Sequence, residues 1–64
     1  MARFEHYQDK GNEWRWRFTS SNGRVIAVSS EGYRNEADCL NGIRLLQSEG
    51  PSAPINRLET PKTH

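Results

Sequence analysis

Aromatic and arginine residues alternate along one short segment, and this segment limits the folds open to the chain more than any other. Trp14, Trp16 and Phe18 are two residues apart, with Arg15 and Arg17 between them. Successive side chains of a β-strand point to opposite faces, so the pattern predicts three rings on one face and two guanidinium groups on the other. Aromatic residues also favour strands over helices. One face of the resulting sheet should therefore be covered.

Two further strands are predicted beside residues 13–18, and the three should form an antiparallel meander. Residues 4–8 alternate loosely, and residues 24–30 contain four consecutive apolar residues at 25–28. Turn-forming residues stand at 9–12 and at Asn22-Gly23. The Asn-Gly pair predicts a type I′ hairpin turn, which needs positive φ at both central residues. Because residues 25–28 are apolar on both faces, the sequence leaves open which face points inward, and we expect both faces to be covered.

A helix is predicted after the sheet, from Asn35 as its N-cap to about Ser48. Acidic residues stand in its first turn, where the helix dipole favours them, and Gly50 and Pro51 end it. Its apolar residues recur at spacings of three and four and form one stripe: Cys39, Leu40, Ile43 and Leu46. Gly42 lies beside this stripe, which favours close approach of another backbone or of a large aromatic ring, with Trp14 or Trp16 as the candidate, over a glycine that is simply tolerated in the helix.

The chain has 64 residues, which is one domain at most. A core this small rarely supplies more than about 3–5 kcal/mol without a disulfide, a metal or a partner chain. Cys39 is the single cysteine, and with His6 and His64 it makes too sparse a set for a zinc site. The sequence therefore predicts an α+β fold completed by homodimerisation: a three-stranded antiparallel meander followed by one helix in residues 1–49, then a flexible tail in residues 50–64. No cofactor is expected.

The outer face of the predicted sheet holds the candidate binding residues, Arg15, Arg17 and Arg24. They could contact carboxylates of a second subunit or of another protein, or form cross-strand pairs with Glu5 or Glu13 on a solvated face. Weak binding of RNA or DNA is the alternative, although the formal net charge is only +1. Rings that face the helix cannot also stack on bases, which disfavours nucleic acid.

Catalytic and membrane functions are not favoured by the sequence. Ser29, Ser30 and Cys39 are possible nucleophiles, with His6 or Glu31 as a base, but none stands in a recognisable nucleophile motif. No glycine-rich phosphate loop is present, and the longest apolar run is far too short to span a membrane. We therefore expect a cytoplasmic protein that is not an enzyme, with a role in protein interaction or structure.

The combined motifs resemble the YegP-like family of small bacterial and archaeal proteins of unknown function. The resemblance covers roughly residues 4–48 and is carried by Phe4, Trp14-Arg15-Trp16-Arg17, Asn22-Gly23, Ile26, Ser30-Glu31-Gly32-Tyr33, Ala37 and Asn41-Gly42-Ile43. It implies a β-β-β-α unit, homodimers for single-unit members, and no known activity or cofactor. His6 departs from the family's usual aliphatic residue. It is either a histidine with a hydrogen-bond partner or part of a pH-sensitive dimer interface.

Overall fold

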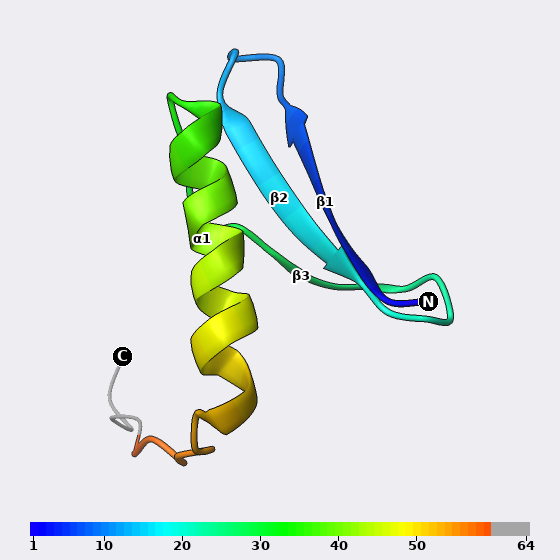
Figure 1. Cartoon of the computed structure of the whole chain (residues 1–64), viewed down its shortest axis with the longest axis vertical. Coiled ribbons are helices and arrows are strands. Elements are labelled where there is room, and N and C mark those ends of the chain that lie inside the picture. The colour runs from blue at the N-terminus through cyan, green and yellow to red at the C-terminus, as the bar shows by residue number, and fades with distance from the viewer. Residues whose placement is uncertain (60–64) are drawn as a thin grey trace.

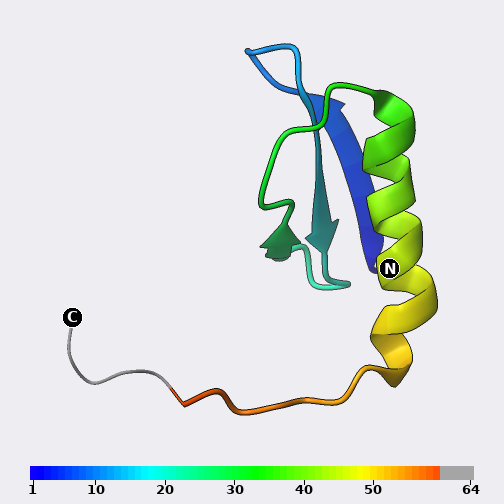
Figure 2. The same ribbon diagram turned by 90° about the vertical axis from the view of Figure 1, so that its left-hand side faces the viewer.

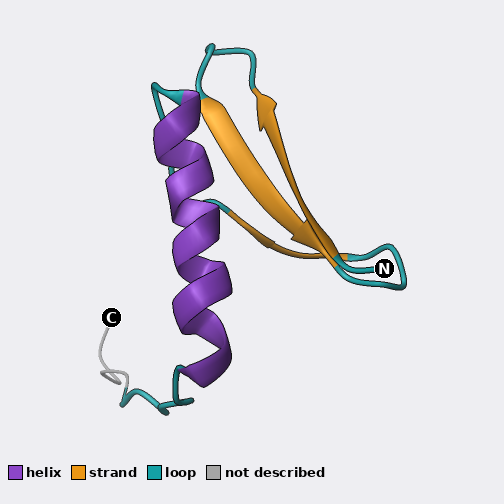
Figure 3. Ribbon diagram, viewed as in Figure 1, coloured by secondary structure: helices purple, strands orange, loops and turns teal. Residues whose placement is uncertain are grey.

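The computed structural model describes residues 1–59, and residues 60–64, including His64, lie outside the described part. Three antiparallel strands, β1 (Arg3–Gln8), β2 (Trp14–Thr19) and β3 (Val25–Val28), form one sheet in the order β1-β2-β3. Helix α1 (Glu36–Glu49) follows, then a single 3₁₀ turn, η1 (Gly50–Ser52) (Figure 1, Figure 3). The predicted α+β fold and its meander are confirmed. The division at residue 49 and the flexibility of the tail stay predictions.

Both hairpin loops contain three residues and share one hydrogen-bond pattern. Gly23 N–H donates to the Ser20 carbonyl (2.9 Å), and Ser20 N–H donates to the Arg24 carbonyl (2.8 Å). In the first loop, Asn12 N–H likewise donates to the Asp9 carbonyl (3.0 Å), and Asp9 N–H donates to the Glu13 carbonyl (2.9 Å). The third loop residue has positive φ in each case, 89° at Gly23 and 63° at Asn12. The predicted type I′ turn is wrong, because Asn22 does not take positive φ and a three-residue loop requires it only at the last position.

Strand β3 leaves its large apolar side chains exposed, contrary to the expectation that both faces of residues 25–28 are covered. Ala27 lies opposite Phe18 on the inner face, whereas Val28 lies opposite Arg17 on the outer face. A register shift follows, so that Val25 pairs with Thr19 and Ile26 is an extra, bulged residue. Ile26 is 63% exposed and Val28 59% exposed. Ala27 takes the inward position opposite Phe18 and is also exposed.

The segment after β3 continues along the edge of β2 and leads the chain to the helix. Ser29 N–H donates to the Trp16 carbonyl (2.9 Å), and Tyr33 exchanges two backbone hydrogen bonds with Trp14. The Tyr33 hydroxyl oxygen lies 3.1 Å from the position a Cβ would take at Gly42, and Trp16 Nε1 lies 3.7 Å from it. The predicted close approach at Gly42 is confirmed, with Trp16 rather than Trp14 and with Tyr33 as a second ring.

Helix α1 packs on the inner face of the sheet against β1 and β2 and does not reach β3 (Figure 2). Asn35 is its N-cap, although its side chain donates to Asp38 Oδ2 (3.4 Å) rather than accepting from the backbone. Cys39 and Ile43 are the buried apolar residues of the described chain, and both belong to α1. The second half of α1 extends beyond the strands (Figure 1), which leaves Leu46 partly uncovered. Gly50 ends the helix in a right-handed conformation and leads into η1.

Replacing Gly32 by alanine should destabilise the fold by about 1–3 kcal/mol. A Cβ at this position would clash with Glu13 Oε1 and would lie 2.8 Å from Glu13 Cβ. The Glu13 Cβ is fixed by the backbone, so the side chain cannot simply swing away. Gly50→Ala is the matched control, because nothing lies within 4 Å of its Cβ position and its φ is −58°. Urea denaturation of both variants checks this, and equal stabilities would contradict it.

Candidate interaction surfaces

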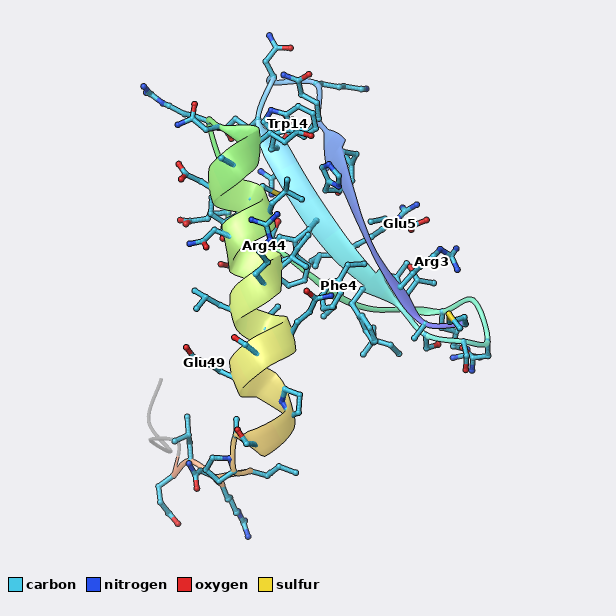
Figure 4. The ribbon with its side chains drawn as sticks, viewed as in Figure 1. Arg3, Phe4, Glu5, Trp14, Arg44 and Glu49 are labelled. Carbon is cyan, nitrogen blue, oxygen red and sulfur yellow. The ribbon has the colours of Figure 1, made fainter. Side chains whose placement is uncertain are left out.

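An open apolar groove lies between the inner face of the sheet and the second half of α1. Its volume is about 260 Å³, and it is lined by side chains from all three strands and the helix: Phe4, Trp16, Phe18, Ala27 and Leu46. Phe4 stands edge-on to Trp16, with ring centroids 5.9 Å apart, and is tilted against Phe18 at 4.9 Å. Figure 4 shows Phe4 directed from β1 toward the helix. These rings were expected in a closed core, but the groove leaves them half-buried.

Trp16 lies at the centre of this packing. Its ring forms part of the wall of the groove, and its indole nitrogen lies close to Gly42. This nitrogen is buried and has no hydrogen-bond partner among the described residues. The residues that line the groove carry no charged, hydroxyl or amide side chain, so its chemistry is that of hydrophobic contact.

The outer face of the sheet holds a group of ion pairs centred on Glu5. Arg3 Nε donates to Glu5 Oε2 (2.9 Å), and Arg17 Nε donates to Glu5 Oε1 (2.8 Å). The Thr19 hydroxyl also donates to Oε1 (3.4 Å). Figure 4 shows Arg3 and Glu5 on the side of β1 that faces away from the helix. Hydrogen bonds from Arg3 and then Arg17 lower the pKa of Glu5 from 4.5 to about 2.

A second ion pair holds Arg15 against the first hairpin loop. Arg15 Nε lies 2.6 Å from Asp9 Oδ2, and the other Asp9 oxygen accepts the backbone N–H groups of Gly11 (2.8 Å) and Glu13 (3.0 Å). The hydrogen bond from Arg15, followed by the one from Glu13 N–H, holds the pKa of Asp9 below its usual value. The same pair raises the pKa of Arg15. The arginine is thus fixed in place by a loop that is itself well ordered by hydrogen bonds.

The structure brings two of the three candidate binding residues together. Arg15 and Arg17 project from the outer face of β2, and the Arg17 guanidinium lies 5.8 Å above the ring of Tyr7. Arg24 stands apart, at the end of the second hairpin loop. The cross-strand pair of Arg17 with Glu5 was foreseen, whereas Arg15 pairs with Asp9 instead of Glu13. The signal that could have identified Asp9 is its position two residues before Gly11, which is typical of an Asx turn.

The residues considered for catalysis are separated or enclosed. Cys39 is fully buried, and burial, then the nearby Glu36 carboxylate, raises the pKa of its thiol. Ser29 is buried, with its hydroxyl accepting from Trp16 N–H (3.4 Å). His6 Nε2 lies 3.0 Å from Glu36 Oε2, with the imidazole beside the ring of Trp14. Within residues 1–59 no cluster of three or more histidine, cysteine or acidic side chains could hold a metal, and no helix has the length and apolarity to cross a membrane.

Comparison with known proteins identifies the family. The model of a domain of unknown function, DUF1508, matches residues 9–56, which is most of the chain. The chain belongs to this family. A UPF0339 protein of Methanosarcina acetivorans is 42% identical over 59 residues, covering 92% of this chain and 100% of the relative. The resemblance to the YegP-like family is thereby confirmed, and DUF1508 membership brings no known activity.

Two solved structures have the same fold as this DUF1508 protein. The solution structure of a protein from Haloferax volcanii has a TM-score of 0.79 and 32% identity, covering 89% of this chain and 95% of that chain. The solution structure of a protein from Agrobacterium tumefaciens has a TM-score of 0.76 and 33% identity, covering 89% and 90%. The β-β-β-α arrangement is therefore shared between archaeal and bacterial members.

Acid titration should show Glu5 as an unusually strong acid. Because its folded-state pKa of about 2 lies below the ordinary 4.5, its ion pairs stabilise the fold fully above that ordinary value and are lost as the pH falls toward about 2. NMR titration of the Glu5 carboxyl carbon should give a midpoint near 2. Arg17→Gln should raise this midpoint, and Arg44→Gln on α1 should leave it unchanged. An ordinary midpoint in the unmodified protein would contradict the geometry.

Proposed function

We propose that this protein is a homodimeric, non-enzymatic interaction module in which a second copy covers the apolar groove. The observation that carries the proposal is the open groove itself. Three half-buried aromatic rings line a cavity of about 260 Å³, while Cys39 (0% exposed) and Ile43 (7% exposed) are the buried apolar residues of the described chain. A second copy would remove these rings from water, at roughly 25 cal/mol for each Å² of apolar surface.

The C-terminal segment supports a second copy as the occupant. Residues 53–59 carry two large apolar side chains, Ile55 and Leu58, and both are exposed. The segment runs away from α1 without entering the space between the helix and the sheet (Figure 1, Figure 2). In a dimer, the segment of each chain can reach the other copy and place apolar side chains against its groove. Exposed apolar residues and an open apolar groove then complement one another within a single assembly.

The absence of enzymatic activity is part of the proposal and rests on the surroundings of the candidate groups. Cys39 is sealed in the core with a raised thiol pKa, and Ser29 is held by the backbone of β2. The imidazole of His6 faces the Glu36 carboxylate. None of these groups forms a nucleophile–base pair of the kind that covalent catalysis needs. A chain with one cysteine also fits the reducing cytoplasm, which we propose as its location.

Nucleic-acid binding is less well supported than protein interaction. Arg15 and Arg17 are each paired with a carboxylate, at 2.6 Å and 2.8 Å, so a run of phosphates along this face would also meet the negative charges of Asp9 and Glu5. The aromatic rings of β2 face the helix and the groove, on the opposite side of the sheet from Arg15 and Arg17, so one strand of nucleic acid cannot stack on the rings and also reach these arginines.

Light scattering on a sizing column across a dilution series tests the dimer. We expect a molar mass of twice the chain's 7.4 kDa that persists to low micromolar concentration. A mass of 7.4 kDa at high concentration, with the chain folded, would overturn the proposal.

A further inference from the structure

We infer that the outer face of the sheet binds an extended segment of another protein in which carboxylate side chains stand between aliphatic ones. The side chains that this face offers for contact are Arg3, Tyr7, Arg15, Arg17, Val25 and Val28, which surround the carboxylate of Glu5. The inference specifies the partner of the proposed interaction module. It does not depend on the dimer, because the groove and the outer face lie on opposite sides of the sheet.

The arginines of the outer face keep hydrogen-bond donors for a ligand. Arg3, Arg15 and Arg17 each make their intramolecular ion pair through Nε, at 2.9 Å, 2.6 Å and 2.8 Å. A guanidinium has five N–H donors in a rigid planar fork, so a pair made at the Nε side leaves donors on the terminal nitrogens. Those donors match the two oxygens of a further carboxylate.

The same ion pairs fix the arginines before a ligand arrives. Glu5 holds Arg3 and Arg17 at once, and Arg17 also lies over the ring of Tyr7. Arg15 is held by Asp9, whose second oxygen is anchored by two backbone N–H groups. Side chains that are already ordered lose less freedom on binding, so the surface is preorganised for recognition.

Apolar side chains stand directly beside these arginines. Val28 is the cross-strand neighbour of Arg17, and Val25 that of Thr19, and both valines are more than half exposed. Arginine and tyrosine are enriched in protein interfaces, whose centres are apolar. The outer face therefore offers aliphatic contacts next to carboxylate-binding groups, which suits a strand with alternating aliphatic and acidic residues.

The charge of the outer face favours such a peptide over nucleic acid. Three guanidinium groups (Arg3, Arg15, Arg17) stand beside three carboxylates (Glu5, Asp9 and Glu13, whose charge also acts on Arg15), so this face has no surplus of positive charge for a continuous run of phosphates. A phosphate chain crossing this face would pass these carboxylates, and its charged backbone would gain nothing from the valines. A few carboxylates separated by aliphatic groups can meet single guanidinium donors and the apolar surface together.

Fluorescence anisotropy of a labelled peptide of about twelve residues, alternating Glu and Val, tests the inference at about 50 mM salt. We expect saturable binding that weakens about tenfold when Gln replaces Glu in the peptide, and about tenfold in the Arg15→Gln/Arg17→Gln variant. Arg44→Gln, an exposed change on α1, is the matched control and should stay within about twofold.

The outcomes separate this inference from the proposed dimer. The outer-face variant should keep the molar mass and thermal stability of the unmodified protein, since exposed ion pairs contribute little to stability. No binding of the acidic peptide, equal binding by the outer-face variant, or tighter binding of a single-stranded DNA of similar length would each overturn the inference. A monomeric mass with intact peptide binding would overturn the dimer alone.

Discussion

Leu46→Glu should convert the protein from a dimer to a folded monomer, whereas Leu45→Glu should leave the dimer intact. The two leucines are adjacent on α1 and similarly exposed, 43% at Leu46 and 51% at Leu45. Only Leu46 lines the apolar groove. A carboxylate there would lose its hydration when a second copy covers the groove, and no described residue lining the groove offers it a charged partner.

The expected effect on assembly is large. Burial of an unpaired charge should raise the dimer dissociation constant by at least about 100-fold, or roughly 2.8 kcal/mol. The fold of the monomer should survive, because Cys39 and Ile43 hold the first half of α1 and are unchanged. Both variants place the same charge in the same part of the helix, so effects of helix propensity and dipole cancel between them.

Light scattering over a dilution series, with circular dichroism to verify folding, checks this pair. If Leu45→Glu dissociated the dimer and Leu46→Glu did not, the contact between copies would lie on the exposed face of α1. If both variants kept the mass of a dimer, the groove would not be the contact, and the exposed edge of β3 would become the better candidate.

The alternation in β2 allowed its structure to be predicted because large aromatic and charged residues cannot exchange faces. Placing Trp16 outward and Arg17 inward would expose a large ring and bury an uncompensated charge, so only one arrangement is acceptable. The helix stripe was equally restrictive for Cys39 and Ile43, which are the enclosed residues of α1. In both β2 and α1, turning the element so that its other face points inward would cost much free energy, and that cost depends only on the residues of the element itself.

The orientation of β3 could not be predicted from the sequence, because its four residues are all apolar. Their side chains carry no signal to separate the two faces, and the bulge at Ile26 depends on pairing with β2. The three-residue hairpin loops are set by the pairing of Asp9 with Glu13 and of Ser20 with Arg24, and the Asn-Gly signal gave the place of the turn but not its type. The partner of Arg15 was missed because Asp9 reaches it from a loop.

The groove was foreseen only indirectly, through the small size of the core. Leu46 belongs to the predicted stripe, but the second half of α1 extends past the strands and leaves it partly uncovered (Figure 1). How far a helix diverges from a sheet depends on the lengths of the helix and the strands and on the angle at which they cross. The spacing of apolar residues along the helix indicates neither the lengths nor the angle. The sequence therefore identified the apolar residues correctly, and the structure shows that one copy does not cover them.

Trp16→Ala should abolish the fold, which makes it the most severe single substitution expected in this chain. Trp16 packs edge-on against Phe4, approaches Gly42 beneath the helix and lines the groove. Removing a large aromatic side chain from such a position costs about 3–5 kcal/mol. A domain of this size has about that much stability in total, so little native protein should remain. Trp16→Phe keeps a ring at the centre, removes an indole N–H without a partner, and should fold.

Urea denaturation followed by circular dichroism, at one fixed protein concentration, distinguishes these cases. Tyr7→Ala on the outer face is the control for loss of an aromatic ring away from the helix, and we expect it to cost less than about 1 kcal/mol. A cooperative transition for Trp16→Ala close to that of the unmodified protein would mean that the sheet and helix are held together elsewhere. The contacts of Trp16 with Phe4 and Gly42 would then contribute little to the stability of the fold, and the helix would be held on the sheet mainly by Cys39 and Ile43.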